Sequence, residues 1–358
     1  MAEPNVLAVL RAALPRVIDP VRPPGRVAAL RGLPGLGALF AGLPLSVEQG
    51  FKPLHDALRA EGLDVVDGVV SKLDGATDGS PPPLVVALPP RSRDEGRALL
   101  ARAWQEVAVG GVVVGAALND EGARSYEKDL AALAVLAGTL SKAHGRAFWT
   151  VPRPAALAAD AKAVLDRWRA ADAPRLDPAS GRWTRPGVFN EGRLDAGSAL
   201  LIEHLPDDLR GRIADLGSGS GLLSIAALER CRGITSLDLF EAEARALDLA
   251  RRNLAGASLP IGFHWLDVAR GVARPEGGFD TVLCNPPFHI GARGVPALGR
   301  AFIAAAAASL HHGGQLLLVA NRHLPYEDVL RESFGRGEAL AERAGFKVYR
   351  AWAPRRSG

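Results

Sequence analysis

Residues 212–231, which read RIADLGSGSGLLSIAALERC, decide the fold of this chain. A short apolar run leads into glycines at alternate positions, and the residues after them show the apolar spacing of a helix. Glycine tolerates the backbone of tight turns and lets the chain approach a ligand closely. The unpaired amides at the start of the following helix favour a polar or anionic group. The stretch therefore predicts a strand, a ligand-binding turn and a helix.

The alternation of strand and helix continues toward the C-terminus. Strands are predicted at residues 212–219, 233–240, 261–268, 279–285, 315–321 and 346–353, and helices at residues 222–231, 241–256 and 296–314. Strands that alternate with helices at this spacing form a mostly parallel sheet with helices on both faces. Ligands of such sheets bind beyond the carboxyl ends of the strands. The second half is therefore predicted to be an α/β domain with its site at that edge.

The turn after the first strand supplies four candidate site residues, which are Asp215, Gly217, Gly219 and Gly221. Its GxGxG spacing differs from the GxGxxG pattern of dinucleotide-binding folds, and it lacks the lysine and hydroxyl of a phosphate-binding P-loop. A small charged ligand is the expected occupant. Taken alone, such a turn also occurs where a strand and a helix merely pack closely, so the site depends on further residues.

Two carboxylates at the ends of later strands extend the candidate site. Glu241 lies just past the second strand, where a carboxylate can accept both hydroxyls of a ribose, although an acid at a helix start also interacts with the helix dipole. Asp238 is the alternative, but it would lie inside the strand. Asp267 follows the third strand and can accept a hydrogen bond from an adenine amine, or it can cap the next helix.

Residues 279–291, FDTVLCNPPFHIG, end a strand at Asn285 and continue with two prolines. Proline cannot donate to a sheet and biases the preceding residue toward extended geometry. The chain therefore leaves the sheet with a stiff, non-helical backbone that holds Asn285 still. The alternative is a turn that only ends a buried strand, and the glycine turn elsewhere in the same domain disfavours it.

The glycine turn, the carboxylates and the NPPFH motif together resemble class I S-adenosylmethionine-dependent methyltransferases. The segments PGVFNEGRLDAGSALLIEHL, NPPFHIG and GGQLLLVANRHLPYEDVLRESFG resemble more specifically the bacterial ribosomal RNA small-subunit methyltransferase C family, over residues 186 to about 352. The resemblance implies S-adenosylmethionine as cofactor, ribosomal RNA or a ribosomal subunit as partner, and the N2 amine of a guanine as target. It also implies a duplicated architecture in which only the second domain binds the cofactor.

The resemblance implies roles for the residues of the NPPFH motif. The side-chain oxygen of Asn285 and the carbonyl of Pro286 would each accept one N–H of the amine, so that its lone pair points at the methyl group. Phe288 would stack on the base. The further candidates for contact with the base or with phosphates are Pro287, His289, Arg293 and Arg300. For His289, an exposed loop residue without such a contact is the favoured interpretation.

The first half resembles a degenerate copy of the second. Residues 84–90, LVVALPP, align with TVLCNPP in the second half, so that Leu88 replaces Asn285. Residues 26–37, RVAALRGLPGLG, align with RIADLGSGSG, so that Ala29 replaces the aspartate. The copy keeps its apolar strands and loses the polar positions, as expected of a domain retained for structure or RNA contact. Chance similarity between two α/β halves is the alternative.

The predicted fold class is α/β, with two tandem Rossmann-like class I methyltransferase domains of which the N-terminal one is degenerate. The degenerate domain is expected over residues 1–170, a linker over residues 171–185, and the catalytic domain over residues 186–358. The linker assignment follows from a stretch rich in Pro, Asp, Ser and Gly after one plausible helix at residues 155–170. The segments PGVF and LDAGS are expected to fold over the cofactor, with Phe189 and Asn190 near the site.

Composition limits the class of protein. The chain has 358 residues, of which 48% are hydrophobic and 23% charged, as in a globular protein of two domains. Its net charge of +4 permits a polyanionic partner, but the excess is divided about evenly between the halves. Cys231 and Cys284 stand alone in apolar surroundings, which argues against a disulfide scaffold and against a cysteine-rich metal site, so no metal is expected.

The N-terminal residues show no signal peptide, and no uncharged apolar run approaches the roughly 20 residues of a membrane span. A cytoplasmic monomer without membrane association is therefore expected. The C-terminal segment GFKVYRAWAPRRSG mixes basic and aromatic residues that can contact RNA, or it is a final strand with a solvated tail. Four alternative functions remain, which are large-subunit rRNA guanine-N2 methylation, protein-glutamine methylation, DNA-adenine methylation, and RNA chaperoning without catalysis.

Overall fold

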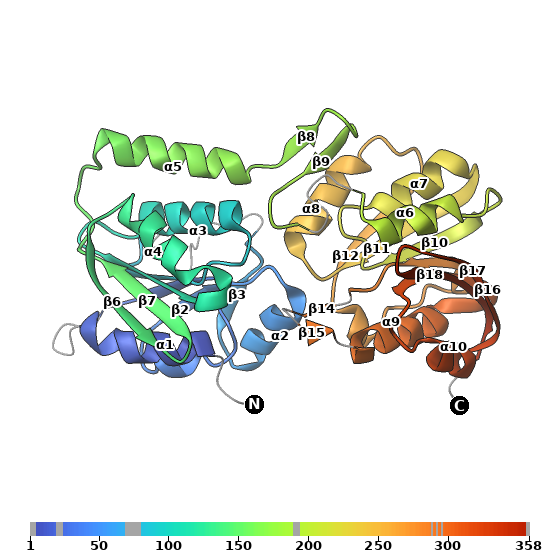
Figure 1. The fold of residues 1–358 in the computed structure, drawn as a ribbon, viewed down its shortest axis with the longest axis horizontal. Helices are drawn as coiled ribbons and strands as arrows, with labels where there is room; N and C mark the ends of the chain where they lie inside the picture. Colours follow the sequence, from blue (N-terminus) through green and yellow to red (C-terminus); the bar gives the residue numbers. More distant parts are fainter. Residues whose placement is uncertain are drawn as a thin grey trace. The chain divides into compact units, whose positions relative to one another are not determined.

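The computed structural model describes residues 5–18, 24–68, 80–188, 194–287, 289–290, 293–294 and 296–355. The chain forms two compact units, one of Met1–Arg175 with Arg185–Gly187 and the other of Leu176–Thr184 with Val188–Gly358. Each unit is built on one seven-stranded sheet (Figure 1). The prediction of two tandem α/β domains is confirmed.

The first unit has the strand order β3-β2-β1-β4-β5-β7-β6, in which β7 runs antiparallel to β5 and β6 and the other neighbours are parallel. Its strands are β1 (Val27–Leu30), β2 (Leu45–Glu48), β3 (Asp64–Val66), β4 (Leu84–Ala87), β5 (Val112–Leu118), β6 (Leu136–Lys142) and β7 (Gly145–Thr150). Its helices are α1 (Asn5–Ala13), α2 (Lys52–Ala60), α3 (Arg93–Glu106), α4 (Ala123–Ala131) and α5 (Ala159–Asp172).

The second unit repeats this order as β12-β11-β10-β13-β16-β18-β17, with β18 antiparallel to both of its neighbours. Its strands are β10 (Arg210–Leu216), β11 (Gly233–Glu241), β12 (Ile261–Trp265), β13 (Phe279–Cys284), β16 (Leu310–Asn321), β17 (Phe334–Arg343) and β18 (Phe346–Pro354). Its helices are α6 (Ala196–Glu203), α7 (Leu222–Arg230), α8 (Ala244–Asn253), α9 (Pro296–Ser309) and α10 (Glu327–Ser333).

Two short antiparallel ribbons accompany the sheets. The first pairs β8 (Arg175–Asp177) with β9 (Arg182–Thr184), and the second pairs β14 (His289–Ile290) with β15 (Arg293–Gly294). The predicted linker, residues 171–185, thus contains the end of α5 and the first ribbon. The second ribbon follows the NPP turn directly.

The registers of the two sheets correspond residue by residue. In the first sheet Val27 of β1 lies beside Leu84 of β4, and in the second Ile213 of β10 lies beside Thr281 of β13. These are the residues that the sequence alignment of the two halves equates. The helix before each first strand also packs on corresponding strands, α1 on β5 and β7 and α6 on β16 and β18. Duplication explains this agreement better than chance similarity does.

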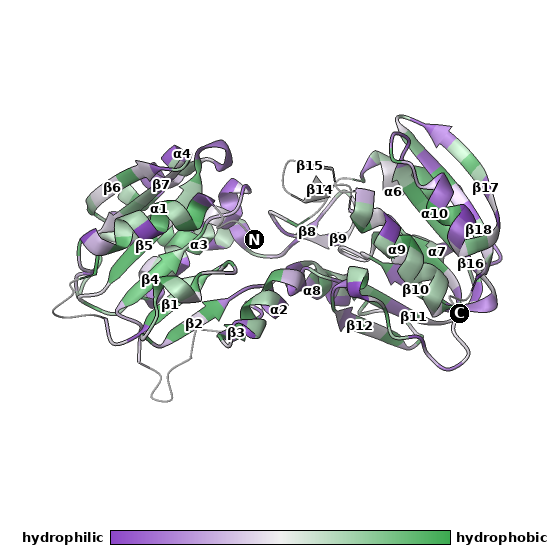
Figure 2. Cartoon of the chain, turned by 90° about the horizontal axis from the view of Figure 1, so that it is seen from below, coloured by the Kyte–Doolittle hydropathy of each residue, from purple (hydrophilic) through white to green (hydrophobic). Residues whose placement is uncertain are grey.

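Apolar side chains on the two faces of each sheet form separate cores. On the second sheet Leu216 and Val282 contribute to the core that includes α9, whereas Ile213 and Leu283 contribute to the core that includes α7. Successive residues of a strand point to opposite faces, so a sheet covered on both faces has nearly continuous apolar strands. Figure 2 shows this for β1 and β4, which are largely green.

Four helices differ from their predicted bounds. α7 ends one residue earlier, at Arg230, and α8 spans Ala244–Asn253 instead of residues 241–256, because Glu243 is extended and serves as its N-cap. α5 begins at Ala159 instead of residue 155, because Ala158 is extended and serves as its N-cap, and it ends at Asp172. α9 ends at Ser309 instead of residue 314, because Leu310 is already buried beside Phe279 in the sheet. A register shift in this strand pair accommodates the two glycines before Gln315.

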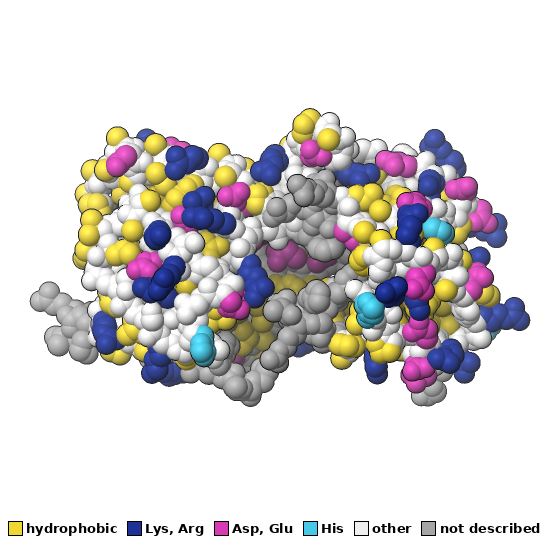
Figure 3. All heavy atoms as spheres, in the orientation of Figure 1, with side chains coloured by type: hydrophobic (Ala, Val, Ile, Leu, Met, Phe, Trp, Pro, Cys, Tyr) yellow, Lys and Arg dark blue, Asp and Glu magenta, His cyan; other side chains and the backbone are white. Residues whose placement is uncertain are grey.

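Basic and acidic side chains are interspersed on the face shown in Figure 3, as the even charge distribution predicts. Within the described ranges, no helix has both the length and the apolar character needed to cross a membrane. The same part of the chain contains no group of three or more His, Cys, Asp or Glu side chains that could hold a metal ion. Cys231 and Cys284 are both buried free thiols.

Candidate active site

The turn after β10 has a backbone that requires glycine. Gly217, Gly219 and Gly221 have φ values of 72°, 54° and 85°, in the left-handed region that side chains with a Cβ disfavour. A Cβ added to Gly219 would meet no atom within 4 Å, so open space lies beside this residue. Gly221 is the N-cap of α7. The turn therefore offers free space at a helix start, where a small ligand can approach the backbone. The amides of Gly217, Gly219 and Gly221 themselves donate to Phe240, Glu241 and Ser218.

Glu241, the last residue of β11, is bonded to this turn. Its Oε2 accepts from the Gly219 amide at 2.8 Å and its Oε1 accepts from the Glu243 amide at 2.8 Å. Burial raises the pKa of Glu241, and the backbone hydrogen bonds oppose that shift. Each carboxylate oxygen has a second lone pair, so Glu241 can also accept from a ligand. The alternative carboxylate, Asp238, lies inside β11 with its Oδ1 2.6 Å from His264 Nε2.

Asp215, near the end of β10, is fully buried. Its Oδ2 accepts from the Ser224 hydroxyl at 2.7 Å, and its Oδ1 has no hydrogen-bond partner among the described residues. Burial raises the pKa of Asp215 to about 7; the Ser224 hydrogen bonds oppose this shift and the charge of Glu241 adds to it. An unpartnered buried oxygen lowers stability, so this oxygen suits a ligand that brings a donor or a positive charge.

The raised pKa of Asp215 predicts how stability depends on pH. In the folded ligand-free chain this carboxyl keeps its proton up to about pH 7, whereas in the unfolded chain it titrates near 3.8. Between these values the folded state binds more protons, so this carboxyl makes the free energy of unfolding fall as pH rises. Asp215→Asn removes that dependence. Its stability advantage over the wild type should therefore grow from about pH 4 to about pH 7 and remain constant above.

Urea unfolding of the wild type and Asp215→Asn at about pH 5, 6, 7 and 8 measures this difference. Ser224→Ala serves as the comparison, because it removes the hydroxyl bonded to Asp215 and keeps the titrating group. An Asp215→Asn advantage that is the same at every pH would contradict the raised pKa.

Asn285 follows β13, and its side-chain amide nitrogen is hydrogen-bonded within the protein. Nδ2 donates to the Ser198 hydroxyl oxygen at 2.8 Å and lies 3.5 Å from Oδ2 of Asp195. Oδ1 of the same amide is buried and has no partner in the part of the chain that the structure describes. Pro286 is buried and Pro287 is exposed. Asn285 therefore presents one unused hydrogen-bond acceptor.

The NPP turn and the glycine turn lie next to each other. Leu216 and Cys284, the last residues of β10 and β13, are neighbours in the parallel pair. A Cβ added to Gly217 would lie 3.9 Å from the backbone oxygen of Asn285. The structure thus brings together the Asn285 amide, the glycine turn with Asp215, and, through Gly219, the Glu241 carboxylate.

Asp267 caps a helical turn, which was the alternative interpretation of this residue. It is the N-cap of a 3-10 turn at Val268–Arg270, where its Oδ1 accepts from the Ala269 amide at 3.0 Å. A contact of Asp267 with adenine stays a prediction. Arg300 lies exposed on α9, where its contact with a phosphate also stays a prediction.

Several predicted contacts fall outside the described residues. These are the contacts of Phe189, Asn190 and Phe288. The structure gives only the backbone of His289 in β14 and of Arg293 in β15. The roles of these residues stay predictions.

Over the described residues, the C-terminal segment forms a final strand, which was the alternative interpretation of its sequence. The Tyr349 hydroxyl donates to Oε1 of Glu327 at 2.6 Å, and Tyr349 is buried. Nε of Arg350 donates to Oε1 of Gln315 at 2.7 Å. The Tyr349 ring is therefore not available to stack on an RNA base.

Sequence reasoning expected the LDAGS segment near the site but gave no role to Asp195 and Ser198, and it missed Ser224. The LDAGS segment does contain a signal for a helix start, because Asp195 is a favourable N-cap residue. Its Oδ1 accepts from the amides of Gly197 and Ser198 at the start of α6. The contact from Ser198 to Asn285 spans 87 positions, and no local pattern indicates it.

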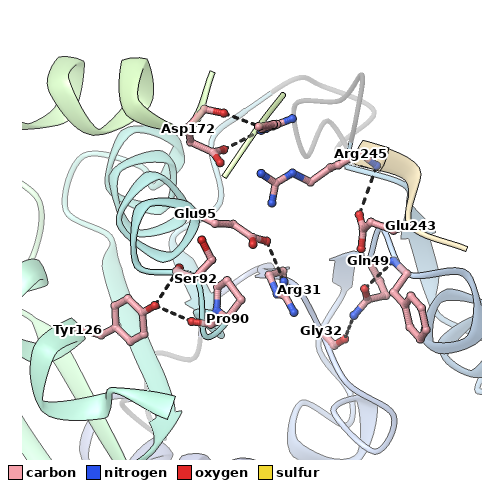
Figure 4. A network of polar contacts seen from close by, with 12 residues as sticks. Arg31, Gly32, Gln49, Pro90, Ser92, Glu95, Tyr126, Asp172, Glu243 and Arg245 are labelled. Carbon is pink, nitrogen blue, oxygen red and sulfur yellow. Dashed lines mark hydrogen bonds and ion pairs between the residues drawn. The ribbon is translucent and has the colours of Figure 1, made fainter. Parts of the chain in front are cut away.

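The first unit closes the corresponding region with its own side chains (Figure 4). Leu30 pairs with Glu48 as Leu216 pairs with Phe240, so Gln49 is the counterpart of Glu241. Oε1 of Gln49 accepts from the Phe51 amide at 2.9 Å, which repeats the bond between Glu241 and Glu243. Nε2 of Gln49 instead donates to the Gly32 carbonyl at 2.7 Å. This nitrogen cannot accept a ribose hydroxyl.

Arg31 stands where the second unit has Gly217. It keeps the left-handed backbone, with φ 57°, and its guanidinium bonds the Glu95 carboxylate at 2.9 Å (Figure 4). The Tyr126 hydroxyl donates to the carbonyl of Pro90, in the turn that corresponds to NPP. One left-handed position of the turn is therefore retained in the first unit, but it carries a side chain bonded to Glu95 where the second unit has glycine.

Comparison with known proteins agrees with the sequence resemblance. Residues 181–350 match the family model described as methyltransferase small domain. Proteins named ribosomal RNA small subunit methyltransferase C are similar, with 37% identity over 163 residues for Shewanella baltica and 39% over 168 residues for Escherichia coli. These alignments cover 46% and 47% of this chain, and the matched region spans about half the length of each relative, 46% and 48%.

A solved structure of a T. thermophilus 16S rRNA N2 methyltransferase, in complex with AdoMet and guanosine, is similar over both units. It has a TM-score of 0.76 and 23% identity, and the match covers 98% of this chain and 92% of that one. At this identity the likeness shows the fold. It therefore supports the tandem arrangement of two methyltransferase-like domains along the whole chain.

Proposed function

We propose that this chain, whose residues 181–350 match the model of the methyltransferase small domain family, methylates the exocyclic N2 amine of a guanine in small-subunit ribosomal RNA. The observation that carries the proposal is the buried Oδ1 of Asn285, which has no partner among the described residues. The backbone oxygen of the same residue lies beside the glycine turn. An acceptor held in this way suits an N–H donor of a planar amine. The names of the curated relatives support ribosomal RNA as the substrate.

The chain's contribution to the reaction is to hold the amine in one orientation. The lone pair of the guanine amine is delocalised into the ring, so the nitrogen is a weak nucleophile. Oδ1 of Asn285 and the carbonyl of Pro286 would each accept one N–H, which favours a pyramidal nitrogen with a directed lone pair. Such positioning lowers the barrier by roughly 7 to 11 kcal/mol in favourable cases. No strong base is needed, because alkylation makes the remaining N–H acidic and water can take the proton.

The residues around the glycine turn fit S-adenosylmethionine, which supplies a methyl group on a sulfonium centre when bound. Glu241 would accept the ribose hydroxyls, and the unpartnered Oδ1 of Asp215 suits the positively charged amino-acid end. The backbone of the turn at Gly219 and Gly221 would line the same site, and Asp267 would accept from the adenine amine. This set has no counterpart in the first unit, so one cofactor per chain is expected.

The other parts of the molecule have proposed roles of their own. Phe288 would stack on the target base, and Pro287, His289, Arg293 and Arg300 would contact the base or nearby phosphates. The first unit would support the second or contact RNA. The protein would act as a monomer in the cytoplasm, on ribosomal RNA or on a ribosomal subunit.

Mapping of N2-methylguanosine in ribosomal RNA from a deletion strain tests the proposal. One small-subunit guanine should lose its methyl group and regain it when the wild-type gene, but not the Asn285→Ala gene, is returned. A missing methyl group in large-subunit RNA would assign the protein to the other subunit. Unchanged ribosomal RNA, with loss of methylation in a protein or in DNA, would overturn the proposal. Failure of the purified chain to bind millimolar S-adenosylmethionine would favour a chaperone.

A further inference from the structure

We propose that Ser198 and Asp195 hold the Asn285 amide in the one orientation that presents its oxygen to the substrate, so that Ser198 is a positioning residue for methyl transfer. The inference rests on the proposed function of Asn285. It assigns a role to the start of α6. This part of the chain is separate from the glycine turn, from Glu241 and from the NPPFH motif.

The two ends of an asparagine amide have nearly the same shape and opposite hydrogen-bonding character. The oxygen accepts and the nitrogen donates, and a rotation of the amide plane by a half turn exchanges them. With the nitrogen toward the substrate, two N–H donors would face the N–H groups of the target amine. That orientation cannot bind the amine productively. A site that uses this asparagine therefore needs a feature that selects between the two orientations.

Asp195 provides the selection because its carboxylate oxygens accept hydrogen bonds. Its Oδ2 lies 3.5 Å from Asn285 Nδ2, so a rotated amide would place an oxygen against an oxygen. The hydroxyl of Ser198 can accept or donate, so it does not select an orientation by itself. Its 2.8 Å bond with Nδ2 instead fixes the position of the amide that Asp195 has oriented.

The fold holds both Asp195 and Ser198 in place. Oδ1 of Asp195 accepts from the amides of Gly197 at 3.0 Å and of Ser198 at 3.2 Å, as the N-cap of α6. Ser198 is buried, with 4% of its surface exposed, so its hydroxyl has little freedom to move away. Because Nδ2 of Asn285 is engaged on this side, Oδ1 is the end of the amide without a partner. The site is thereby set to take a donor and to reject a carbonyl oxygen.

Steady-state kinetics of Ser198→Ala on ribosomal RNA tests the proposal first. We expect kcat to fall about tenfold, the size expected for one hydrogen bond, with the Kd for S-adenosylmethionine unchanged within about twofold. Ser198→Thr keeps the hydroxyl and should restore most of the rate. Ser309→Ala is the matched control, because it also removes a buried hydroxyl of the second unit, one that donates to the Ala306 carbonyl in α9. If Ser309→Ala lowered kcat as much as Ser198→Ala, that result would contradict a specific role for Ser198.

A double-mutant cycle separates positioning from general destabilisation. If Ser198 acts through the amide, Ser198→Ala should cost nothing further in an Asn285→Ala background. A tenfold loss in both backgrounds would overturn the proposal. Asp195→Asn gives a second arm, since its amide can donate to a rotated Asn285. We expect it to lower kcat more than Ser198→Ala does.

A readout without turnover keeps the inference separate from the proposed function. In full-length protein with labelled asparagine, the Asn285 side-chain amide protons should exchange slowly with solvent, and Ser198→Ala should speed that exchange at least about tenfold. If Ser198→Ala left the exchange rate of the Asn285 amide protons unchanged, the positioning role would be wrong even if the enzyme is active. A wild type that methylates no guanine would instead refute the proposed function, whatever the exchange shows.

Discussion

Replacing Asn285 with alanine is expected to slow methyl transfer to ribosomal RNA by at least about 100-fold. The loss is of the size seen when one preorganised polar contact is removed from an active site. The affinity for S-adenosylmethionine should change by less than about threefold, because no hydrogen bond joins the Asn285 side chain to the glycine turn or to Glu241 among those seen in the described residues. Single-turnover methylation and calorimetric titration of the cofactor measure the two quantities separately.

Asn321→Ala is the matched control for this experiment. Asn321 ends β16, the strand beside β13, and its side-chain oxygen accepts from the His323 amide at 3.1 Å. It should keep both turnover and cofactor affinity. If Asn285→Ala reduced cofactor binding as strongly as turnover, Asn285 would be a structural residue at the end of the strand and the mechanism would fail.

The sequence predicted the strands that carry an apolar pattern, including β12 at one edge of the second sheet, and missed β17 at the other edge. β10 and β13 are apolar along most of their length, since both faces of the sheet are covered. β17 reads FGRGEALAER, and only Phe334 at its start is buried. It is an edge strand of the sheet, with one neighbour, β18. An edge strand with exposed polar side chains lacks the apolar pattern by which strands are predicted.

The parts of the site that depend on local backbone chemistry were also predictable. Glycines at alternate positions mark a turn that needs a left-handed backbone, and two prolines after an asparagine fix a non-helical exit from the strand. The position of Ser198 depends instead on how α6 packs against the sheet, which residue spacing cannot give. Asp267 shows a third case, because a helix cap and a ligand contact require the same residue type at the same place.

The duplicated fold shows what the polar site residues do to stability. Asp215 and Asn285 each have a buried oxygen without a partner in the described part of the chain, an arrangement that lowers stability unless a ligand is bound. In the first unit the corresponding residues, Ala29 and Leu88, are apolar and buried. A copy released from catalysis can thus keep the fold and remove its unsatisfied groups. Functional sites are where a sequence departs from the rules of a stable core.

Replacing Glu241 with alanine is expected to weaken S-adenosylmethionine binding by at least about 100-fold. The variant would lose two charge-assisted hydrogen bonds to the ribose, each worth about 1.5 to 3 kcal/mol. It would also lose the bond that fixes the Gly219 amide at 2.8 Å. Glu241→Gln should weaken cofactor binding almost as much, because an amide nitrogen beside the Gly219 N–H places donor against donor. The first unit has glutamine at this position, with its nitrogen bonded to a carbonyl instead.

Asp238→Ala decides between the two carboxylates that the sequence offers for the ribose. Asp238 is also on β11, but its Oδ1 is 2.6 Å from Nε2 of His264 on the neighbouring strand β12. We therefore expect calorimetry to give the wild-type Kd for this variant within about threefold, with some loss of thermal stability. Tight binding by Glu241→Ala together with weak binding by Asp238→Ala would assign the ribose to Asp238. The bond from Glu241 to the glycine turn would then be purely structural.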